Sequence, residues 1–368
     1  MVVVMLDDNY YDLTLFNHPG GNDIIKEFKN KDASIAYKSI HLKKTLTKLN
    51  PYLVKGEFNV KQKPKFLFNT EFADAIRDLN FKDSNSAPVL WWVRYFIINA
   101  MWMYLEYNHW VNPNIINSII LGVTFAGIGL CIGHDGSHYA VSKNKNVNYF
   151  MSLYMDVIGF NNKNWFSQHI MQHHLYTNNS KFDPDTKGGE PFFVIDPEER
   201  IKDNNHLYVI WMLGFSIVFD IKRLFNMTSK KQIAINLILR FLFFVRIFYS
   251  SIINGMIIVF VTGFVLSNLF IISHNYEDVS RNEENMCWYK NQIETSSTYG
   301  GPTAGFLTGG LNYQIEHHCF PRMNSMYYPV IHKQLREICK NHKVKYTYFK
   351  TVAENINSMF KYLTKKKV

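Results

Sequence analysis

The stretch NIINSIILGVTFAGIGLCIGHDGSH, residues 114–138, joins a long apolar segment to two histidines that are four residues apart. Residues 114–133 are long enough for a helix to cross about 30 Å of hydrocarbon. The segment contains four small residues that allow close packing against another helix, namely Gly122, Ala126, Gly127 and Gly129. In a continuing helix, His134 and His138 would lie on one face. The stretch therefore predicts a membrane helix that ends at a metal site.

Three further segments have the composition and length of membrane helices. They cover residues 89–108, 233–249 and 252–273. Arg94 lies near one end of the first segment, where its side chain could snorkel to the interface. Two shorter apolar pieces, residues 147–160 and 207–219, are interpreted as interfacial or re-entrant helices. The sequence predicts an all-α membrane protein with about four transmembrane helices.

The histidines repeat the pattern of the opening stretch. Seven of the fourteen fall in three clusters: His134 and His138 in HDGSH; His169, His173 and His174 in QHIMQHH; and His317 and His318 in QIEHH. Four spans place all three clusters on the same side of the membrane, and His274 ends the last apolar run. His109, His206, His332 and His342 follow no pattern and are interpreted as surface or interfacial residues.

Charge and cysteine usage narrow the class of protein. The formal net charge is +10, but Lys and Arg lie in segments that flank apolar spans, which favours a membrane protein over a nucleic-acid-binding one. By the positive-inside bias, the histidine side and both termini are expected to be cytosolic. The four widely spaced cysteines frame neither disulfides nor a zinc site. The final KKKV, residues 365–368, matches a dilysine retrieval signal for the endoplasmic reticulum.

Several imidazole faces can converge on iron, for which neutral nitrogen ligands are well suited. Zinc takes four ligands, often with cysteine or carboxylate, and has no redox chemistry. Seven or eight histidines exceed one tetrahedral site, and two iron ions that activate O₂ would use them. The clusters predict a metal-dependent redox enzyme.

Longer motifs around these histidines resemble those of a known family. HHLYTNNSKFDPDT (173–186) and TGGLNYQIEHHCFPRM (308–323) are similar to blocks of the membrane front-end fatty-acyl desaturases. YYDLTLFNHPGG (10–21) and DASIAYKSIH (32–41) resemble the core of cytochrome b5. The third histidine cluster of the front-end type begins with Gln, which here is Gln314. The resemblance covers nearly the whole chain.

The resemblance implies a set of site residues and a reaction. The implied ligands of two non-haem irons are the seven clustered histidines His134, His138, His169, His173, His174, His317 and His318, together with His274 and Gln314. The implied reaction is O₂-dependent desaturation of a lipid acyl chain, which introduces a cis double bond on the carboxyl side of existing ones. His18 and His41 are the implied axial ligands of haem b, which leave no coordination site open for O₂. Cytochrome b5 reductase is the implied electron donor.

The domain organisation follows from these assignments. We expect a cytochrome b5-like α+β haem domain over residues 1–59, apparently shortened at its start, and a linker over 60–87. The transmembrane desaturase domain with a cytosolic histidine-box cap is expected over 88–345, and a cytosolic tail over 346–368. We expect no nucleic-acid partner. A sphingolipid long-chain-base desaturase, a related acyl hydroxylase and a membrane-anchored electron-transfer protein remain alternatives.

Overall fold

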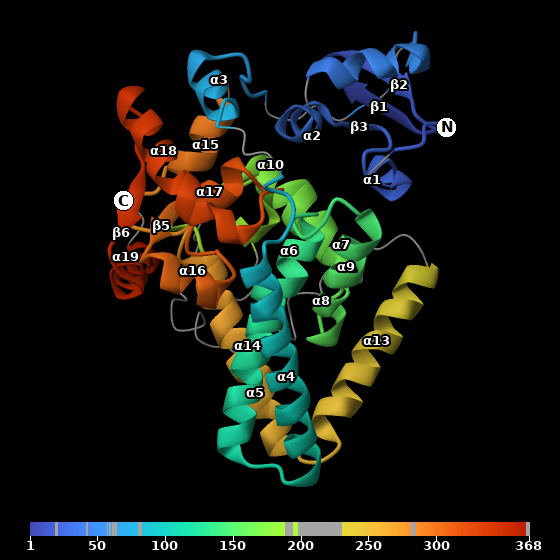
Figure 1. The fold of residues 1–368 in the computed structure, drawn as a ribbon. Coiled ribbons are helices and arrows are strands. Elements are labelled where there is room, and N and C mark those ends of the chain that lie inside the picture. Colours follow the sequence, from blue (N-terminus) through green and yellow to red (C-terminus); the bar gives the residue numbers. More distant parts are fainter. Residues whose placement is uncertain are drawn as a thin grey trace.

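The protein consists of a bundle of long helices, a compact cap above it and a small N-terminal domain beside the cap (Figure 1). The computed structural model describes residues 1–18, 21–41, 43–56, 58, 60, 65–79, 83–187, 194–197, 230–280 and 285–365. The predicted short helix over residues 207–219, His206 and most of the KKKV motif lie outside these residues. The described chain is mostly helical, as expected.

Four long helices form the bundle, and each overlaps one of the predicted apolar segments. They are α4 (Val89–Val111), α5 (Ile115–Ile128), α13 (Lys230–Phe248) and α14 (Ile252–Ile271). Asn114 caps α5 and Ser251 caps α14 by accepting a hydrogen bond from a backbone N–H of the first turn. Short turns therefore join α4 to α5 and α13 to α14 at the far end of the bundle (Figure 1).

Gly122 of the opening stretch has the predicted packing role, whereas a Cβ at Gly127 would meet nothing within 4 Å. A Cβ added at Gly122 would lie 2.8 Å from Cβ of Val261, closer than side chains allow. The Thr262 hydroxyl donates to the Gly122 carbonyl across the same contact, at 3.0 Å. Helices α5 and α14 thus approach each other through a glycine, which is how small residues bring membrane helices together.

Two of the described helices are long and apolar enough to cross a membrane, namely residues Ile115–Ser137 and Ile252–Ile271. Helices α4 and α13 are 23 and 19 residues long but do not meet the same measure of apolarity. α4 includes Arg94 and Glu106, and α13 includes Arg240 and Arg246. The expectation of four transmembrane helices is thus met for two of them by length and composition.

The snorkelling role expected of Arg94 is wrong. Its side chain is only 3% exposed and lies 3.6 Å from the buried carboxylate of Asp135. It also donates to the carbonyls of Cys131 and Phe306. Arg94 faces the protein interior because a buried carboxylate and these carbonyls compensate its charge there.

The histidine clusters lie in a cap of short elements above the bundle. α5 continues through a π-helical turn, η2 (Gly129–Gly133), into α6 (His134–Ser137). The elements that follow are α7 (Lys145–Ser152), α8 (Tyr154–Val157), α9 (Asn162–Trp165), the π-helix η3 (Phe166–His173), α10 (His174–Tyr176) and the 3₁₀ turn η4 (Pro184–Lys187). α7 and α8 occupy the predicted interfacial piece 147–160.

The C-terminal part of the chain completes the cap. It contains α15 (Trp288–Glu294), β5 (Ser297–Tyr299), α16 (Pro302–Thr308), α17 (Gln314–Cys319), η6 (Ser325–Tyr327), α18 (Tyr328–Asn341), β6 (Thr347–Phe349) and α19 (Val352–Thr364), and α3 (Glu71–Arg77) packs on it. Strands β5 and β6 pair in parallel, a short sheet that an all-α prediction for this region did not include. The sheet supports α17, which contains the third histidine cluster.

The N-terminal domain is a small α+β unit, as predicted. Its sheet has the order β3-β1-β2-β4. The strands are β1 (Val3–Leu6), β2 (Asn9–Asp12), β3 (Lys31–Asp32) and β4 (Leu53–Val54), and the helices are α1 (Asn22–Glu27), α2 (Ser34–Ile40) and the 3₁₀ helix η1 (Lys43–Tyr52). β1 pairs antiparallel with β2, and Val4 lies opposite Tyr11.

Candidate metal centre

Two π-helical segments present the histidines to the centre of the cap. In η3 each turn takes in more residues than an α-helical turn. His169 can therefore face both of the histidines that follow it, and its ring centroid lies 5.4 Å from that of His173 and 4.7 Å from that of His174. π-helical turns of this kind occur frequently at functional sites.

The first histidine cluster combines all three sequence motifs. The ligand atoms of His134, His138, His169 and His317 lie within 4.8 Å of one another, and all four side chains are buried. Nε2 of His169 is 3.1 Å from Nε2 of His134 and 3.3 Å from Nε2 of His174. Nε2 of His138 and Nε2 of His317 have no hydrogen-bond partner among the described residues. Nitrogen lone pairs therefore converge on one point.

The second cluster consists of His173, His274 and His318, whose ligand atoms also lie within 4.8 Å of one another. Nε2 of His274 is 3.1 Å from Nε2 of His318. The amide Nε2 of Gln314 lies 3.0 Å from Nε2 of His274, which places Gln314 at the edge of this cluster. The structure thus brings every histidine of the predicted ligand set, and Gln314, into one buried centre.

His174 lies between the two clusters. Its ring centroid is 4.7 Å from that of His138 and 4.6 Å from that of His317 in the first cluster. It is stacked on His318 of the second cluster at 4.2 Å. This side chain holds the two groups of ligand atoms next to each other.

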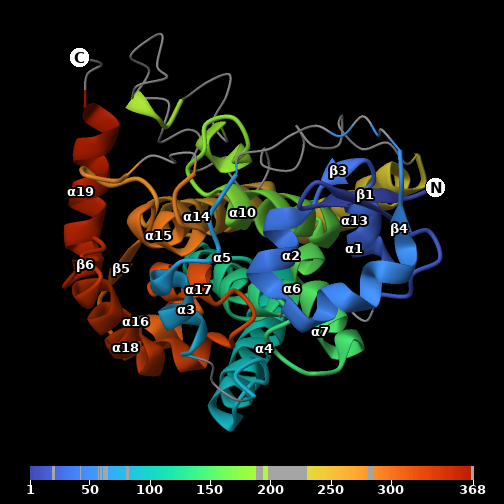
Figure 2. The ribbon, with the colours of Figure 1, turned by 90° about the horizontal axis from the view of Figure 1, so that it is seen from above.

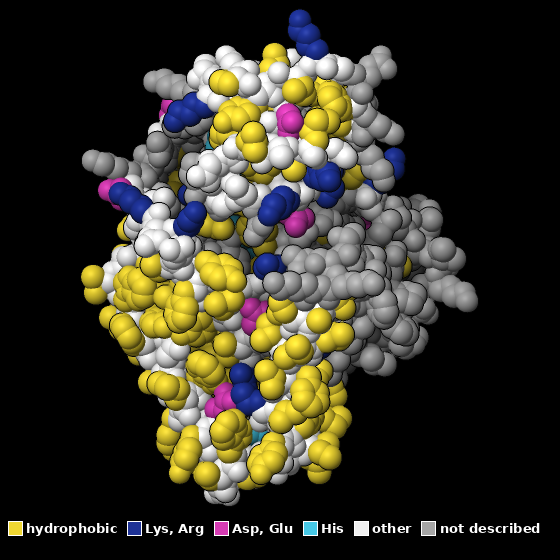
Figure 3. Space-filling view, turned by 90° about the vertical axis from the view of Figure 1, so that its right-hand side faces the viewer, with side chains coloured by type: hydrophobic (Ala, Val, Ile, Leu, Met, Phe, Trp, Pro, Cys, Tyr) yellow, Lys and Arg dark blue, Asp and Glu magenta, His cyan; other side chains and the backbone are white. Residues whose placement is uncertain are grey.

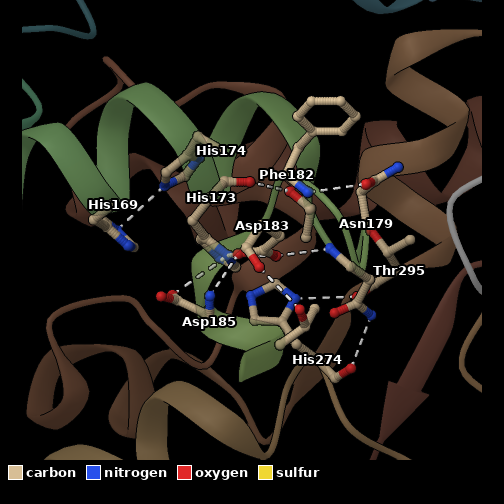
Figure 4. A network of polar contacts seen from close by, with 12 residues as sticks. His169, His173, His174, Asn179, Phe182, Asp183, Asp185, His274 and Thr295 are labelled. Carbon is tan, nitrogen blue, oxygen red and sulfur yellow. Dashed lines mark hydrogen bonds and ion pairs between the residues drawn. The ribbon is translucent and has the colours of Figure 1, made fainter. Parts of the chain in front are cut away.

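The outward nitrogens of the second cluster all have partners, which fixes the rings; Figure 4 shows those of His173 and His274. Nδ1 of His173 donates to Asp183 at 3.0 Å, and Nδ1 of His274 donates to the Thr295 carbonyl at 3.1 Å. Nδ1 of His318 lies 2.8 Å from Oε1 of Gln292. A donor bond at Nδ1 leaves the Nε2 lone pair for a metal, and such partners orient metal-bound histidines in general.

The electrostatics of the centre favour neutral imidazoles at most positions. Burial, reinforced by neighbouring histidines, lowers the pKa of His138, His169, His174, His317 and His318 well below the usual value. Burial lowers the pKa of His274 to about 3. Burial also acts to lower the pKa of His173, but the carboxylates of Asp183 and Asp185 outweigh it and raise that pKa to about 9. Buried neutral imidazoles whose nitrogens lack partners would be costly in an ordinary apolar core, whereas metal ions would use those nitrogens as ligands.

A buried polar network holds the first histidine motif in place. Asp135 accepts hydrogen bonds from the Trp91 indole at 2.7 Å and from the Ser325 hydroxyl at 2.8 Å, in addition to its contact with Arg94. The network ties α4, α6 and the segment after α17 together. Asp135 follows His134 directly in the chain, and its three partners come from two other elements, α4 and η6.

A second network, around Glu316, includes residues that were not predicted from sequence. Glu316 is fully buried and accepts a hydrogen bond from Thr298 Oγ1 at 2.8 Å. Nδ1 of His332 lies 2.9 Å from its other oxygen, and Tyr346 also donates to that oxygen. His332 is therefore not simply a surface residue, and only its lack of local patterning led to that interpretation. His109 was also misplaced, because it is buried and lies 2.8 Å from the Ile247 carbonyl.

The third motif enters the centre through a tight glycine turn. Gly309 has φ of +67°, and a Cβ there would lie 2.2 Å from the carbonyl oxygen of Leu130 in η2. We expect Gly309→Ala to lower the free energy of unfolding by more than about 1 kcal/mol, because alanine is strained at positive φ and the backbone leaves no room. Thermal unfolding of the detergent-solubilised protein measures this.

Gly127→Ala is the matched control, because a Cβ at Gly127 meets nothing within 4 Å and the position is helical. Its Tm is expected to equal or exceed that of the unaltered protein. Equal Tm values for the two variants would contradict the account of the Gly309 turn.

The Asp183 carboxylate, which accepts a hydrogen bond from His173, leads to a second prediction. Replacing Asp183 with asparagine keeps the size of the side chain but removes the carboxylate that orients His173. Loss of such a partner typically costs 10–100-fold in metal affinity, so we expect Asp183→Asn to weaken iron binding by about that factor. Iron titration of the metal-depleted protein measures it, with the exposed Asp74→Asn on α3 as control.

The two histidines of the N-terminal domain face each other. The ring centroids of His18 and His41 are 5.8 Å apart, and the rings are inclined by 73°. Nδ1 of His41 donates to the Tyr37 carbonyl at 3.2 Å, so that its Nε2 is available as a ligand. Burial is the main cause that lowers the pKa of both histidines. Two neutral imidazoles that face each other fit the axial ligands of a haem.

Comparison with known proteins agrees with both halves of this description. The family model described as fatty acid desaturase matches residues 108–350, and the cytochrome b5-like haem/steroid binding domain matches residues 2–59. The acyl-lipid (7-3)-desaturase of Rebecca salina is 28% identical over 401 residues, covering 98% of this chain and 90% of that protein. The acyl-lipid (8-3)-desaturase B of Dictyostelium discoideum is 27% identical over 426 residues, with 98% and 90% covered.

Proposed function

The chain belongs to the fatty acid desaturase family and has a cytochrome b5-like domain at its N-terminus, and we propose that it desaturates lipid acyl chains with O₂ at a di-iron centre. The new double bond lies on the carboxyl side of existing ones, in polyunsaturated fatty acid synthesis. One observation carries the proposal: all the histidines of the three motifs converge in two adjacent buried clusters at one end of the apolar helices. The front-end resemblance of the motifs agrees with the names of the relatives.

Each cluster would hold one iron. The first would use His134, His138, His169 and His317, and the second would use His173, His274 and His318. His174 would complete the first set, and Gln314 would be a weaker ligand at the second. Bound iron would supply the O₂ activation and hydrogen abstraction that amino-acid side chains cannot perform.

The surrounding residues hold the rings rigidly. Trp165 stacks on His169 with ring centroids 4.5 Å apart, and the Tyr328 hydroxyl lies 2.9 Å from Nδ1 of His317. Together with Asp183 and Asp135, these contacts fix the rings in the folded state. A site that is held in place in this way loses little free energy to reorganisation when a metal or substrate binds.

We propose that all four long helices lie in the membrane. Large apolar side chains of α4 and α13, among them Phe96, Tyr104, Phe241 and Leu242, are more than half exposed. The lower half of the molecule is correspondingly covered with apolar side chains in Figure 3. Exposure of this kind is costly in water but not in lipid. The haem domain, the cap and both termini would then face the cytosol, at the surface of the endoplasmic reticulum.

The electron supply follows from the same assignment. Haem b held by His18 and His41 would receive electrons one at a time from cytochrome b5 reductase. We retain the division into a haem domain (1–59), a linker (60–87), a desaturase domain (88–345) and a C-terminal segment (346–368) as part of the proposal.

Expression in yeast with single polyunsaturated fatty acids tests the function. We expect a product two hydrogens lighter than the fatty acid supplied, with a new double bond nearer the carboxyl group. A gain of one oxygen would identify a hydroxylase instead. Modification of sphingoid bases alone would identify a long-chain-base desaturase, and no product together with an intact haem spectrum would favour an electron-transfer protein.

A further inference from the structure

The N-terminal domain and the cap share one continuous apolar core. Buried side chains of β1 and α2, including Val4, Ile35 and Ala36, belong to the same cluster as Met171, Leu175 and Tyr176 of η3 and α10. α2 lies beside α10 in both Figure 1 and Figure 2, and the two helices are in direct contact. A shared core of this kind holds two domains in one orientation, unlike a polar contact between tethered domains.

Polar contacts at the edge of this core agree with a fixed orientation. The Ser167 hydroxyl of η3 donates to Oε2 of Glu27 at the end of α1, at 3.4 Å. The Lys38 ammonium of α2 lies 5.9 Å from the ring centroid of Phe68, in the segment before α3. The contact therefore extends from α1 across α2 to the segment that leads into the cap.

The implied haem ligand His41 lies at the end of the helix that makes this contact, α2. His41 follows directly after α2, and its ring is stacked on Tyr37 of α2 with centroids 4.9 Å apart. The Tyr37 carbonyl also accepts the His41 Nδ1–H. Tyr37 packs in turn against the shared core.

The iron-side ligands belong to the elements on the opposite side of the contact. Met171 and Leu175 face the shared core, while His169, His173 and His174 of the same turns face the metal centre. The same two turns of helix thus contact the N-terminal domain on one side and supply ligands on the other.

We propose that the contact of α2 with η3 and α10 is the electron-transfer interface of the protein, used in the docked orientation seen here. The proposal rests on the proposed function. Each transfer oxidises the ferrous haem by one electron and reduces the non-haem iron pair by one. Two transfers and two protons, with two hydrogens removed from the acyl chain, balance the reduction of O₂ to two waters. A flavoprotein reductase supplies the electrons to the haem.

The test compares two carboxylates introduced into α2 of the full-length holoprotein. Ala36→Glu places one in the shared core, whereas Ile40→Glu places the same charge at a position that is 37% exposed, as a control. The haem is reduced anaerobically and mixed with O₂ and acyl substrate, and its re-oxidation is followed by absorbance. We expect Ala36→Glu to slow re-oxidation at least about tenfold, which corresponds to a loss of about 1.4 kcal/mol in the free energy of docking. Ile40→Glu should match the unaltered protein.

Hydrogen exchange supplies a readout that does not depend on turnover. Amides of residues 166–176 should exchange faster in Ala36→Glu than in the unaltered protein, and at the unaltered rate in Ile40→Glu. If Ala36→Glu fails to bind haem, Ile170→Glu introduces the charge from the cap side, where Ile170 packs against the same core, and is assayed in its place.

The outcomes separate the interface from the function. Faster exchange without slower re-oxidation would overturn the proposal, because electrons would then pass without docking. Unchanged exchange would also overturn it, because the core would tolerate a buried charge and so could not hold the domains together. An unaltered protein that shows no substrate-dependent re-oxidation would instead count against the proposed function.

Discussion

Replacing His317 with alanine is expected to produce a folded, haem-containing protein that binds less iron and has lost desaturase activity. His317 is buried, and its Nε2 is one of the converging nitrogens of the first cluster. Removing a ligand should exceed the 10–100-fold loss that follows removal of a supporting residue, so we expect activity to fall by more than about 100-fold. Non-haem iron per chain and product formation in yeast are the two measurements.

His342→Ala is the control for this variant. His342 is also a histidine of the cap, but it lies at the C-terminal end of α18, where its ring contacts Phe72 of α3, and it belongs to neither cluster. It should retain iron and activity. Full iron and full activity in His317→Ala, and likewise in His134→Ala and His173→Ala, would reject the di-iron assignment.

Replacing His41 with alanine is expected to have the opposite effect on the two cofactors. The haem absorbance should disappear, because one of two facing imidazoles is lost, while non-haem iron should remain at the unaltered level. Desaturation that depends on the fused domain should fall by at least about tenfold, a loss that corresponds to about 1.4 kcal/mol in the rate-limiting barrier. Absorbance spectra and iron analysis of the same purified sample measure both.

The neighbouring Ser39→Ala removes only a hydroxyl that donates to the Ala36 carbonyl within α2, and it should keep the haem. An unchanged haem band in His41→Ala would end the assignment of His41 as a ligand. Loss of iron together with haem in that variant would indicate that the substitution unfolds the chain, and the His317 comparison would then decide whether the clusters bind iron.

The sequence predicted the location of the centre well because its residues are local in pattern. An i,i+4 pair such as His134 and His138 shares a helix face whatever surrounds it. Apolar segments on either side of the motifs then place them at one end of the bundle. The facing pair His18 and His41 could be found only through the resemblance of their flanking motifs, since neither has a local spacing signal.

The division of the ligands into two groups could not be predicted. It depends on the π-helical geometry of η3, which directs His173 to the second cluster while His169 remains in the first. No single residue type in a helical sequence predicts a change from α-helical to π-helical geometry. His274 joins the second cluster from the end of α14, a contact that only the tertiary fold creates.

The remaining wrong predictions concern residues whose partners are distant in the sequence. Arg94 was expected at an interface because an isolated arginine in an apolar helix snorkels, but Asp135 allows it to remain inside. His332 has no local pattern because its partner, Glu316, is sixteen residues away on another helix. The parallel pairing of β5 with β6 joins segments 50 residues apart, for which the short runs of three residues give no signal.

Non-haem iron in the purified, full-length protein tests the central claim most directly. Total iron is measured by chelation and colorimetric assay, and the haem iron, determined from the haem absorbance, is subtracted from it. We expect two non-haem irons per chain, one for each histidine cluster. A preparation that is folded and active but contains no stoichiometric non-haem iron would contradict the account.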